Sequence, residues 1–302
     1  MEAITSSHLD VQKSAIKKQG TDLAMFLLRY IESSGIPPKT ESAKERTVQG
    51  GLAVLTWSLS NIISHSLLAH AEELEEGVKE TLGKYFRTIV LYGVSATGLG
   101  QIPRETAARL YSPLRDPNLS QEDRIKQFAI WVSSYFPPVS DLSGITLEEV
   151  TSRKAVHLGK TVSVSPDVQK GPTVERMSPE EFEAMTDVDA LTRSSQYILR
   201  VNPDIYRENF ERAHWRQDSD KSESVAWPQL KILVVWCGMD VGDCIWAVSR
   251  FREELDNTPT IRRPVSIQSI PFGNHFAHWE DPKEFTSFLA LNIDGVASTL
   301  LE

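Results

Sequence analysis

The sequence of 302 residues has little cysteine and no long apolar run. Its two cysteines, Cys237 and Cys244, are too few for a disulfide framework, which makes a reducing compartment the default expectation. No stretch approaches the roughly 18 apolar residues of a membrane-spanning helix. The N-terminal residues also lack the apolar core of a secretory signal. We therefore expect a cytoplasmic protein without a membrane span.

An excess of positive charge is missing as well. The chain has 41 acidic and 32 basic residues, which gives a formal net charge of −9. Nucleic acids and anionic membranes attract basic surfaces, so this balance argues against both as partners. Hydrophobic residues at 40% and charged residues at 24% are ordinary values for a globular protein. The length allows one large α/β domain with an insertion, or two small domains.

Motifs for metals and cofactors are absent from the sequence. His275 and His278 lie close together, but no H-E-x-x-H motif or cysteine cluster accompanies them, so no metal site is expected. The glycines between positions 93 and 100 lack the G-x-G-x-x-G spacing and the later acidic residue of a dinucleotide site. Cys237 reads as a buried apolar residue rather than a nucleophile. We predict no cofactor.

Hydrophobic periodicity predicts alternating strands and helices at both ends of the chain. Short apolar runs indicate buried strands at 51–57, 87–93, 231–237 and 264–270. Helical spacing covers 8–33, 59–69, 72–85, 243–255 and 281–293. The segment 34–50 carries one glycine and two prolines within a polar stretch, which predicts an exposed loop. Strands that alternate with helices favour an α/β fold with a parallel sheet of about four strands.

Between these parts, residues 95–228 show no convincing buried strand and predict a mostly helical insertion. Helical pieces are expected near 121–134, 178–185, 187–195 and 203–212. A disordered insertion is the alternative, but seven aromatic residues supply core material: Trp131, Tyr135, Phe136, Tyr197, Tyr206, Phe210 and Trp215. The chain would then have three parts, residues 1–94, 95–228 and 229–302.

Polar residues follow three of the predicted strands at their carboxyl ends. Ser58 lies in T-W-S-L-S-N after the first strand, Asp240 in C-G-M-D after the third, and His275 in G-N-H after the fourth. The carboxyl ends of parallel strands meet at one edge of a sheet, where ligands of open α/β folds bind. We therefore expect the three side chains to lie together.

The chain order serine, aspartate, histidine on these strand ends resembles the α/β-hydrolase superfamily of serine esterases and lipases. The resemblance covers most of the chain from residue 50 onward, with the insertion where such enzymes carry a lid. It implies a partial α/β-hydrolase fold and a serine hydrolase that cleaves an ester or related acyl bond through an acyl-enzyme. Ser58 would attack the acyl carbon, His275 would move its proton, and Asp240 would orient the imidazole. The amide of Leu59 would stabilise the oxyanion.

Alternatives stay open at each position. Ser58 is also a plausible helix N-cap, Asp243 competes with Asp240 as the acid, and His278 competes with His275. The family pattern G-x-S-x-G places small residues where this chain has Thr56 and Ser60, and a β-branched threonine departs from it. Epoxide hydrolases usually carry aspartate at the nucleophile position, which disfavours that reaction here. Carboxylesterase, lactonase, thioesterase, acyl-transfer and cofactor-free haloperoxidase activities remain open. Aromatic residues of the insertion, if they face the site, favour a small molecule with an apolar acyl group.

The position of Ser58 predicts that the sheet lacks the four strands that precede the nucleophile strand in the family. The loop that supplies the second oxyanion donor would be missing with them. An apolar edge strand would result, with open hydrogen-bonding groups. The chain would be a truncated product, a divergent chain whose edge is covered by a partner or a second copy, or a rearranged fold. A catalytically weak or inactive relative that serves as a binding module is therefore the alternative function.

Overall fold

The computed structural model describes residues 8–42, 47–100, 109–156, 171–187, 198–215, 225–258 and 260–294. The predicted helix at 187–195 and Tyr197 lie outside these residues, apart from Asp187. A four-stranded parallel sheet forms the centre, with spatial order β3–β4–β5–β6. Its strands are β3 (Leu52–Trp57), β4 (Phe86–Tyr92), β5 (Lys231–Cys237) and β6 (Val265–Ile270). The four predicted strands are therefore confirmed to within two residues.

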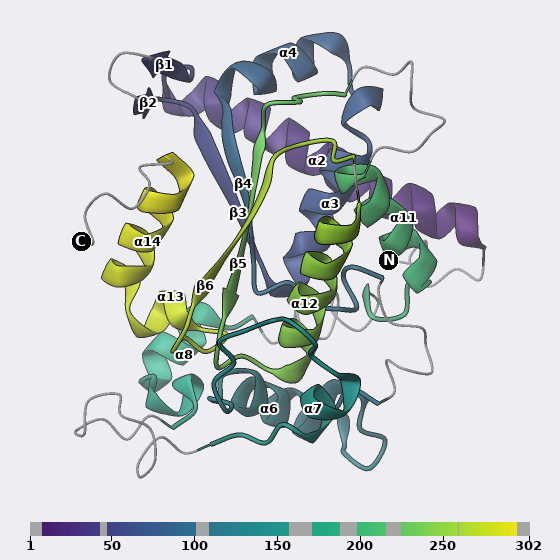
Figure 1. Ribbon diagram of the computed structural model, residues 1–302, viewed down its shortest axis with the longest axis vertical. Coiled ribbons are helices and arrows are strands. Elements are labelled where there is room, and N and C mark those ends of the chain that lie inside the picture. Colours follow the sequence, from purple (N-terminus) through teal and green to yellow (C-terminus); the bar gives the residue numbers. More distant parts are fainter. Residues whose placement is uncertain are drawn as a thin grey trace.

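Helices cover both faces of this sheet (Figure 1). One face packs against α13 (Ala277–Glu280) and α14 (Pro282–Asp294), and the other against the remaining long helices. These are α2 (Leu9–Ser34), α3 (Asn61–Ala69), α4 (Glu76–Tyr85), α11 (Pro203–His214) and α12 (Gly242–Asn257). The central strands β4 and β5 alternate apolar side chains between the two cores, as the period of a strand requires. Asp281 caps α14, because its Oδ1 accepts a hydrogen bond from Glu284 N at 3.0 Å.

In the part of the chain that the structure describes, the segment between β4 and β5 contains helices and no strand beyond an isolated bridge at Trp215. It contains α6 (Gln121–Val132), α7 (Leu147–Ser152) and α8 (Pro179–Met185), which lie beyond the carboxyl ends of the strands (Figure 1). Its last helix, α11, instead packs against α3 beside the sheet. Most of the aromatic residues expected to supply core are buried: Tyr135, Phe136, Tyr206, Phe210 and Trp215. An α/β fold with a four-stranded parallel sheet and a mostly helical insertion is the architecture of the described residues. None of the described helices is long and apolar enough to cross a bilayer.

The segment 34–50 differs from the predicted loop. It contains a short antiparallel hairpin, β1 (Thr40–Ser42) with β2 (Thr47–Gln49), which pairs with itself and not with the main sheet. The next residues, Gly50 and Gly51, both have positive φ angles, and a Cβ at Gly51 would lie 2.5 Å from the carbonyl oxygen of Tyr85. The prediction failed because three-residue strands leave too little hydrophobic pattern to detect.

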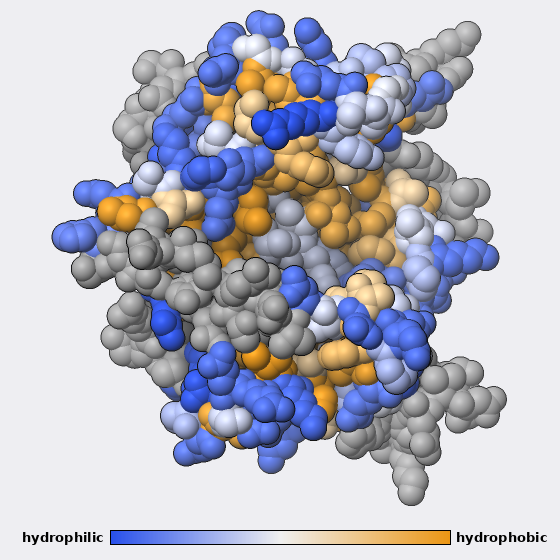
Figure 2. Space-filling view, turned by 180° about the vertical axis from the view of Figure 1, so that it is seen from behind, coloured by the Kyte–Doolittle hydropathy of each residue, from blue (hydrophilic) through white to orange (hydrophobic). Residues whose placement is uncertain are grey.

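The strand β3 forms one edge of the sheet, and no other strand of the described residues pairs with its free side. Leu55 on this strand is 40% exposed, and Phe26 on α2 is 61% exposed. In Figure 1, β6 lies in front and β3 at the opposite edge, so Figure 2 looks from behind onto the β3 side. Apolar residues gather across the hollowed middle of that side (Figure 2). The predicted apolar edge strand is thus present.

A pair of histidines lies inside the helical layer. His65 on α3 is only 1% exposed, and its ring lies 5.3 Å from that of His214 on α11. Within the described ranges, none of their four ring nitrogens has a hydrogen-bond partner. Burial lowers the pKa of His65 from 6.5 to about 3, and burial also lowers the pKa of His214 well below its usual value. His65 is buried because α11, an element distant in sequence, packs against α3.

This pair predicts loss of stability in mild acid. The unfolded chain takes up a proton near pH 6.5 while folded His65 stays neutral down to about pH 3. Stability is therefore full above the unfolded pKa and falls as the pH drops below it. Between about pH 7.5 and about pH 5, His65 alone accounts for a loss of about 2 kcal/mol. We expect His65→Leu to reduce this loss, measured by urea unfolding at both pH values.

The exposed His8 provides the control, because His8→Gln should keep the wild-type pH dependence. A His65→Leu protein that loses as much stability as the wild type over this interval would contradict the assignment.

Candidate active site

Ser58 lies at a sharp turn between β3 and α3. Its φ angle is +57°, in the left-handed region that non-glycine residues rarely adopt. Such a conformation typically costs about 1–3 kcal/mol and is often found at functional sites. A short 3₁₀ turn, Ser58–Ser60, then leads into α3. The backbone therefore turns sharply at the residue that the sequence singles out as the nucleophile candidate.

Two hydroxyl groups brace this turn where the family pattern has glycines. Thr56 Oγ1 donates to Asn61 Oδ1 at 2.9 Å, and Asn61 Nδ2 donates to the carbonyl oxygens of Ser58 at 2.6 Å and Tyr92 at 3.0 Å. Ser60 Oγ accepts from Trp57 N at 2.9 Å and donates to Trp57 O at 2.6 Å. Threonine is accommodated because its hydroxyl is used. Sequence reasoning missed Asn61, although a polar residue inside an otherwise apolar helix start was a detectable signal.

His275 and Asp240 form a buried pair. The two carboxylate oxygens of Asp240 both lie 3.1 Å from His275 Nδ1, and the side chains are 1% and 2% exposed. Asp240 Oδ1 also accepts a hydrogen bond from Val241 N at 2.7 Å. A carboxylate can only accept, so Nδ1 carries the hydrogen and Nε2 is left as the free basic nitrogen. The predicted acid and histidine are therefore brought together.

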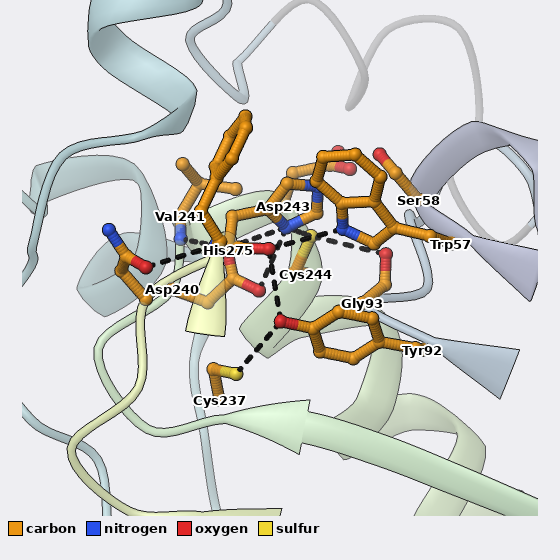
Figure 3. A network of polar contacts seen from close by, with 12 residues as sticks. Trp57, Ser58, Tyr92, Gly93, Cys237, Asp240, Val241, Asp243, Cys244 and His275 are labelled. Atoms are coloured by element: carbon orange, nitrogen blue, oxygen red, sulfur yellow. Dashed lines mark hydrogen bonds and ion pairs between the residues drawn. The ribbon is translucent and has the colours of Figure 1, made fainter. Parts of the chain in front are cut away.

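The backbone at His275 is held by two donors from neighbouring strands. Tyr92 Oη and Trp57 Nε1 each donate to the carbonyl oxygen of His275 at 3.1 Å. The Trp57 ring lies 5.3 Å from the imidazole, and Trp57 and Asp240 approach it from different sides (Figure 3). Gly93 leaves room for the ring, because a Cβ there would lie 2.9 Å from His275 Cε1. The imidazole is thus fixed by packing as well as by Asp240.

Asn274, next to His275, ties this loop to the insertion. It is fully buried, and its Nδ2 donates to Ser133 O at 2.7 Å and to Thr173 Oγ1 at 2.8 Å. Its Oδ1 accepts from Phe276 N at 2.9 Å. The insertion therefore contributes directly to the position of the histidine loop. These partners could not be predicted from the sequence, because they are separated from Asn274 by more than a hundred residues.

The competing candidates occupy other places. Asp243 makes no hydrogen bond to His275, and its Oδ2 accepts from Ala96 N at 3.2 Å. His278 contacts Trp57 at 4.4 Å between ring centres, and burial lowers the pKa of His278 to about 4. Asp240, rather than Asp243, is the carboxylate that meets His275 in this structure.

A cavity of about 420 Å³ joins these residues. Ser58, Leu59, Asp243 and His275 line it, and the Ser58 hydroxyl has no hydrogen-bond partner within the described residues. The insertion supplies apolar walls, including Phe128, Trp131, Val132, Phe182 and Met185. The first N–H groups of a helix have no intrahelical partner, so the amide of Leu59 at the start of the turn is available to a ligand. Serine and imidazole thus open into one mostly apolar chamber.

A metal would find an unsuitable set of ligands at this place. Asp240, Cys244 and His275 are, among the residues described, three groups whose ligand atoms lie within 4.8 Å of one another. Burial raises the pKa of the Cys244 thiol well above its usual value, whereas metal ligation requires the thiolate. The imidazole nitrogen that faces the set is already bonded to the carboxylate. The set fits a hydrogen-bonded pair better than a metal centre.

Comparison with known proteins gives matches only among solved structures. No family model and no curated protein matches the chain. BpoC from Mycobacterium tuberculosis H37Rv, assigned as a non-heme bromoperoxidase, is 13% identical with a TM-score of 0.33, over 82% of this chain and 68% of that one. A laboratory-evolved variant of the potato epoxide hydrolase StEH1 is 14% identical with a TM-score of 0.36, over 81% and 70%. At such values the reactions of these proteins do not transfer to this chain.

The brace beneath Ser58 is open to a direct test. Thr56→Val keeps the shape of the side chain but removes the hydroxyl, which leaves the buried Asn61 Oδ1 without its donor. An unsatisfied buried group of this kind costs about 1–3 kcal/mol. We expect a loss of that size in the free energy of unfolding, measured by urea titration. Thr56→Ser, which keeps the hydroxyl, should lose clearly less, and equal losses in the two variants would refute the role of the bond.

Proposed function

We propose that this chain is a serine hydrolase that cleaves an ester or a related acyl bond through an acyl-enzyme. The observation that carries the proposal is the buried Asp240–His275 pair, which opens together with a left-handed Ser58 into one cavity. These are the parts that acyl transfer by a serine needs: a protruding hydroxyl, an imidazole base and a carboxylate that orients the base.

In the proposed reaction, Ser58 Oγ attacks the acyl carbon and His275 Nε2 accepts its proton. Asp240 holds the imidazole by Nδ1 and stabilises the imidazolium that forms. His275 then returns the proton to the leaving alcohol as the tetrahedral intermediate collapses to the acyl-enzyme. Water, deprotonated by the same imidazole, attacks the acyl carbon and releases the acid and free Ser58. Ser58 and His275 have no direct hydrogen bond in the structure, and bonds between a nucleophile and its base often tighten only when substrate binds.

The proposed oxyanion site is weak. The amide of Leu59 supplies one donor, and the sheet has no strand before β3 in the described residues that would carry a second donor loop. Loss of one oxyanion donor typically lowers the rate by about 10²–10³. We therefore expect slow turnover rather than none. Residues 95–228 would act as a lid, because α6 and α8 line the cavity, and their apolar side chains favour an apolar acyl group.

A fluorophosphonate probe tests the nucleophile. Folded wild-type protein should be labelled at Ser58, and Ser58→Ala should not be labelled, as read by mass spectrometry of the modified peptide. Ser95→Ala serves as the matched control, because Ser95 also lines the cavity and its removal should leave labelling in place. Asp240→Asn should slow ester hydrolysis by up to about 10⁴-fold, since the amide favours the wrong imidazole tautomer. Equal labelling of wild type and Ser58→Ala would sink the proposal.

The second candidate function is a binding module, which the open edge of β3 favours. Unpaired strand edges with apolar side chains are templates for pairing with another chain. We propose that a second copy of this chain covers the edge, because a two-fold axis beside β3 would bring two identical uncharged strands together. The exposed Phe26 and Tyr30, which stack on α2, would extend the same apolar contact.

Light scattering after size exclusion tests this pairing. The wild type should elute as a dimer, and Leu55→Lys should shift it toward monomer, because a lysine there places like charges at the shared edge. A surface change elsewhere, Leu291→Lys on α14, provides the comparison and should keep the dimer. A wild type that is monomeric at all concentrations tested would exclude the second copy without bearing on Ser58.

A further inference from the structure

Asp243 lies in the first turn of α12 with one of its carboxylate oxygens unused. Its Oδ2 accepts a hydrogen bond from Ala96 N at 3.2 Å, which fixes the orientation of the side chain. Its Oδ1 is buried and has no hydrogen-bond partner among the residues that the structure describes. Asp243, His275 and Trp57 line the same cavity, and all three are drawn in one group of side chains in Figure 3. A buried acceptor without a donor destabilises a folded protein. A bound ligand that donates a hydrogen bond to Oδ1 would remove this cost.

The cavity beside Asp243 shows where such a ligand would bind. Asp243, Ser58 and His275 line the same cavity, whose other walls are mostly apolar. Arg115 also lines this cavity, but its Nη2 donates to the carbonyl oxygen of Leu110 at 2.7 Å and not to Asp243. Among the described residues, a ligand in front of Ser58 therefore meets two unpartnered buried polar atoms in a mostly apolar wall, Asp243 Oδ1 and His278 Nδ1. The carboxylate oxygen accepts whichever tautomer His278 adopts, whereas the imidazole nitrogen can donate or accept.

We propose that Asp243 Oδ1 binds a hydrogen-bond donor of the substrate, a hydroxyl or an ammonium group on the acyl chain. This inference rests on the proposed hydrolase function and narrows its substrate class. A carboxylate only accepts hydrogen bonds. An ester whose acyl chain carries a donor therefore satisfies Oδ1, whereas an ester without a donor leaves Oδ1 without a hydrogen-bond partner. Sites built around a buried polar group reject analogues that lack the matching group far more strongly than apolar sites do.

Burial raises the pKa of Asp243, while the charge of Arg115 and the bond from Ala96 N oppose that shift. The nearby positive charge of Arg115 reduces the preference for an ammonium over a neutral hydroxyl. An anionic acyl substituent, in contrast, would face the carboxylate directly. The site thus favours neutral or cationic donors and disfavours carboxylates.

The test uses p-nitrophenyl esters of butyrate, of 2-, 3- and 4-hydroxybutyrate and of 4-aminobutyrate. In the wild type, kcat/KM for at least one hydroxy or amino ester should exceed that for butyrate by about tenfold or more, as expected for a hydrogen bond to a charged group. Asp243→Asn keeps the shape, but its oxygen would bond Ala96 N and its amide would present donors to the cavity. The ratio should then fall to about one or below. Asp256→Asn, an exposed aspartate on the same helix, should keep the wild-type ratio.

A binding measurement keeps the inference separate from catalysis. In Ser58→Ala, ligand-observed NMR titration with the ethyl esters of butyrate and of the preferred hydroxybutyrate should give tighter binding for the hydroxy ester. The double variant with Asp243→Asn should lose this difference. No turnover of any ester would overturn the hydrolase function alone. Equal binding of the two esters in Ser58→Ala, or a ratio unchanged by Asp243→Asn, would overturn the role of Asp243.

Discussion

The hydrogen bond between His275 and Asp240 is the interaction on which the arrangement of the site depends. A buried carboxylate without a partner would be strongly unfavourable, so Asp240 requires the imidazole as much as the imidazole requires Asp240. The two residues come from the ends of adjacent strands, β5 and β6, and the bond can form only if those strands stay in register. The sheet is thus a frame that holds strand ends side by side. Tyr92 and Trp57, from the other two strands, add donors to the His275 carbonyl, so all four strands converge on one residue.

The fold was predictable from sequence to the extent that its elements are buried. The central strands β4 and β5 contain continuous apolar runs because both faces of each strand are covered. These runs predicted the ends of both strands to within one residue. Ser58, Asp240 and His275 could be picked out because polar residues at the ends of such runs are conspicuous. The edge strand β6 alternates in exposure, and its inward residues are still sufficient to mark it.

The remaining features could not be predicted because they depend on contacts between distant elements. His65 shows an ordinary helical environment in sequence, and only the packing of α11 on α3 buries it beside His214. Asn274 meets Ser133 and Thr173 across the join between the histidine loop and the insertion. The free oxygen of Asp243 likewise depends on Ala96 taking the other one. In each case, local propensity carries no information about the partner.

The turn at Ser58 combines a left-handed backbone with hydroxyl residues at the positions where the G-x-S-x-G pattern has glycines. Glycines on both sides of a nucleophile remove steric conflict, whereas this chain has two hydroxyl residues there. Their hydroxyl groups form hydrogen bonds within the turn and to Asn61. These hydrogen bonds stabilise the turn, whereas glycines would allow it through their conformational freedom. Asn61 in turn joins the Ser58 carbonyl to that of Tyr92 on β4. Because Tyr92 also holds His275, the strained backbone of Ser58 and the imidazole are connected through β4. The relative position of the two is therefore set by one strand, even with the sheet open beside β3.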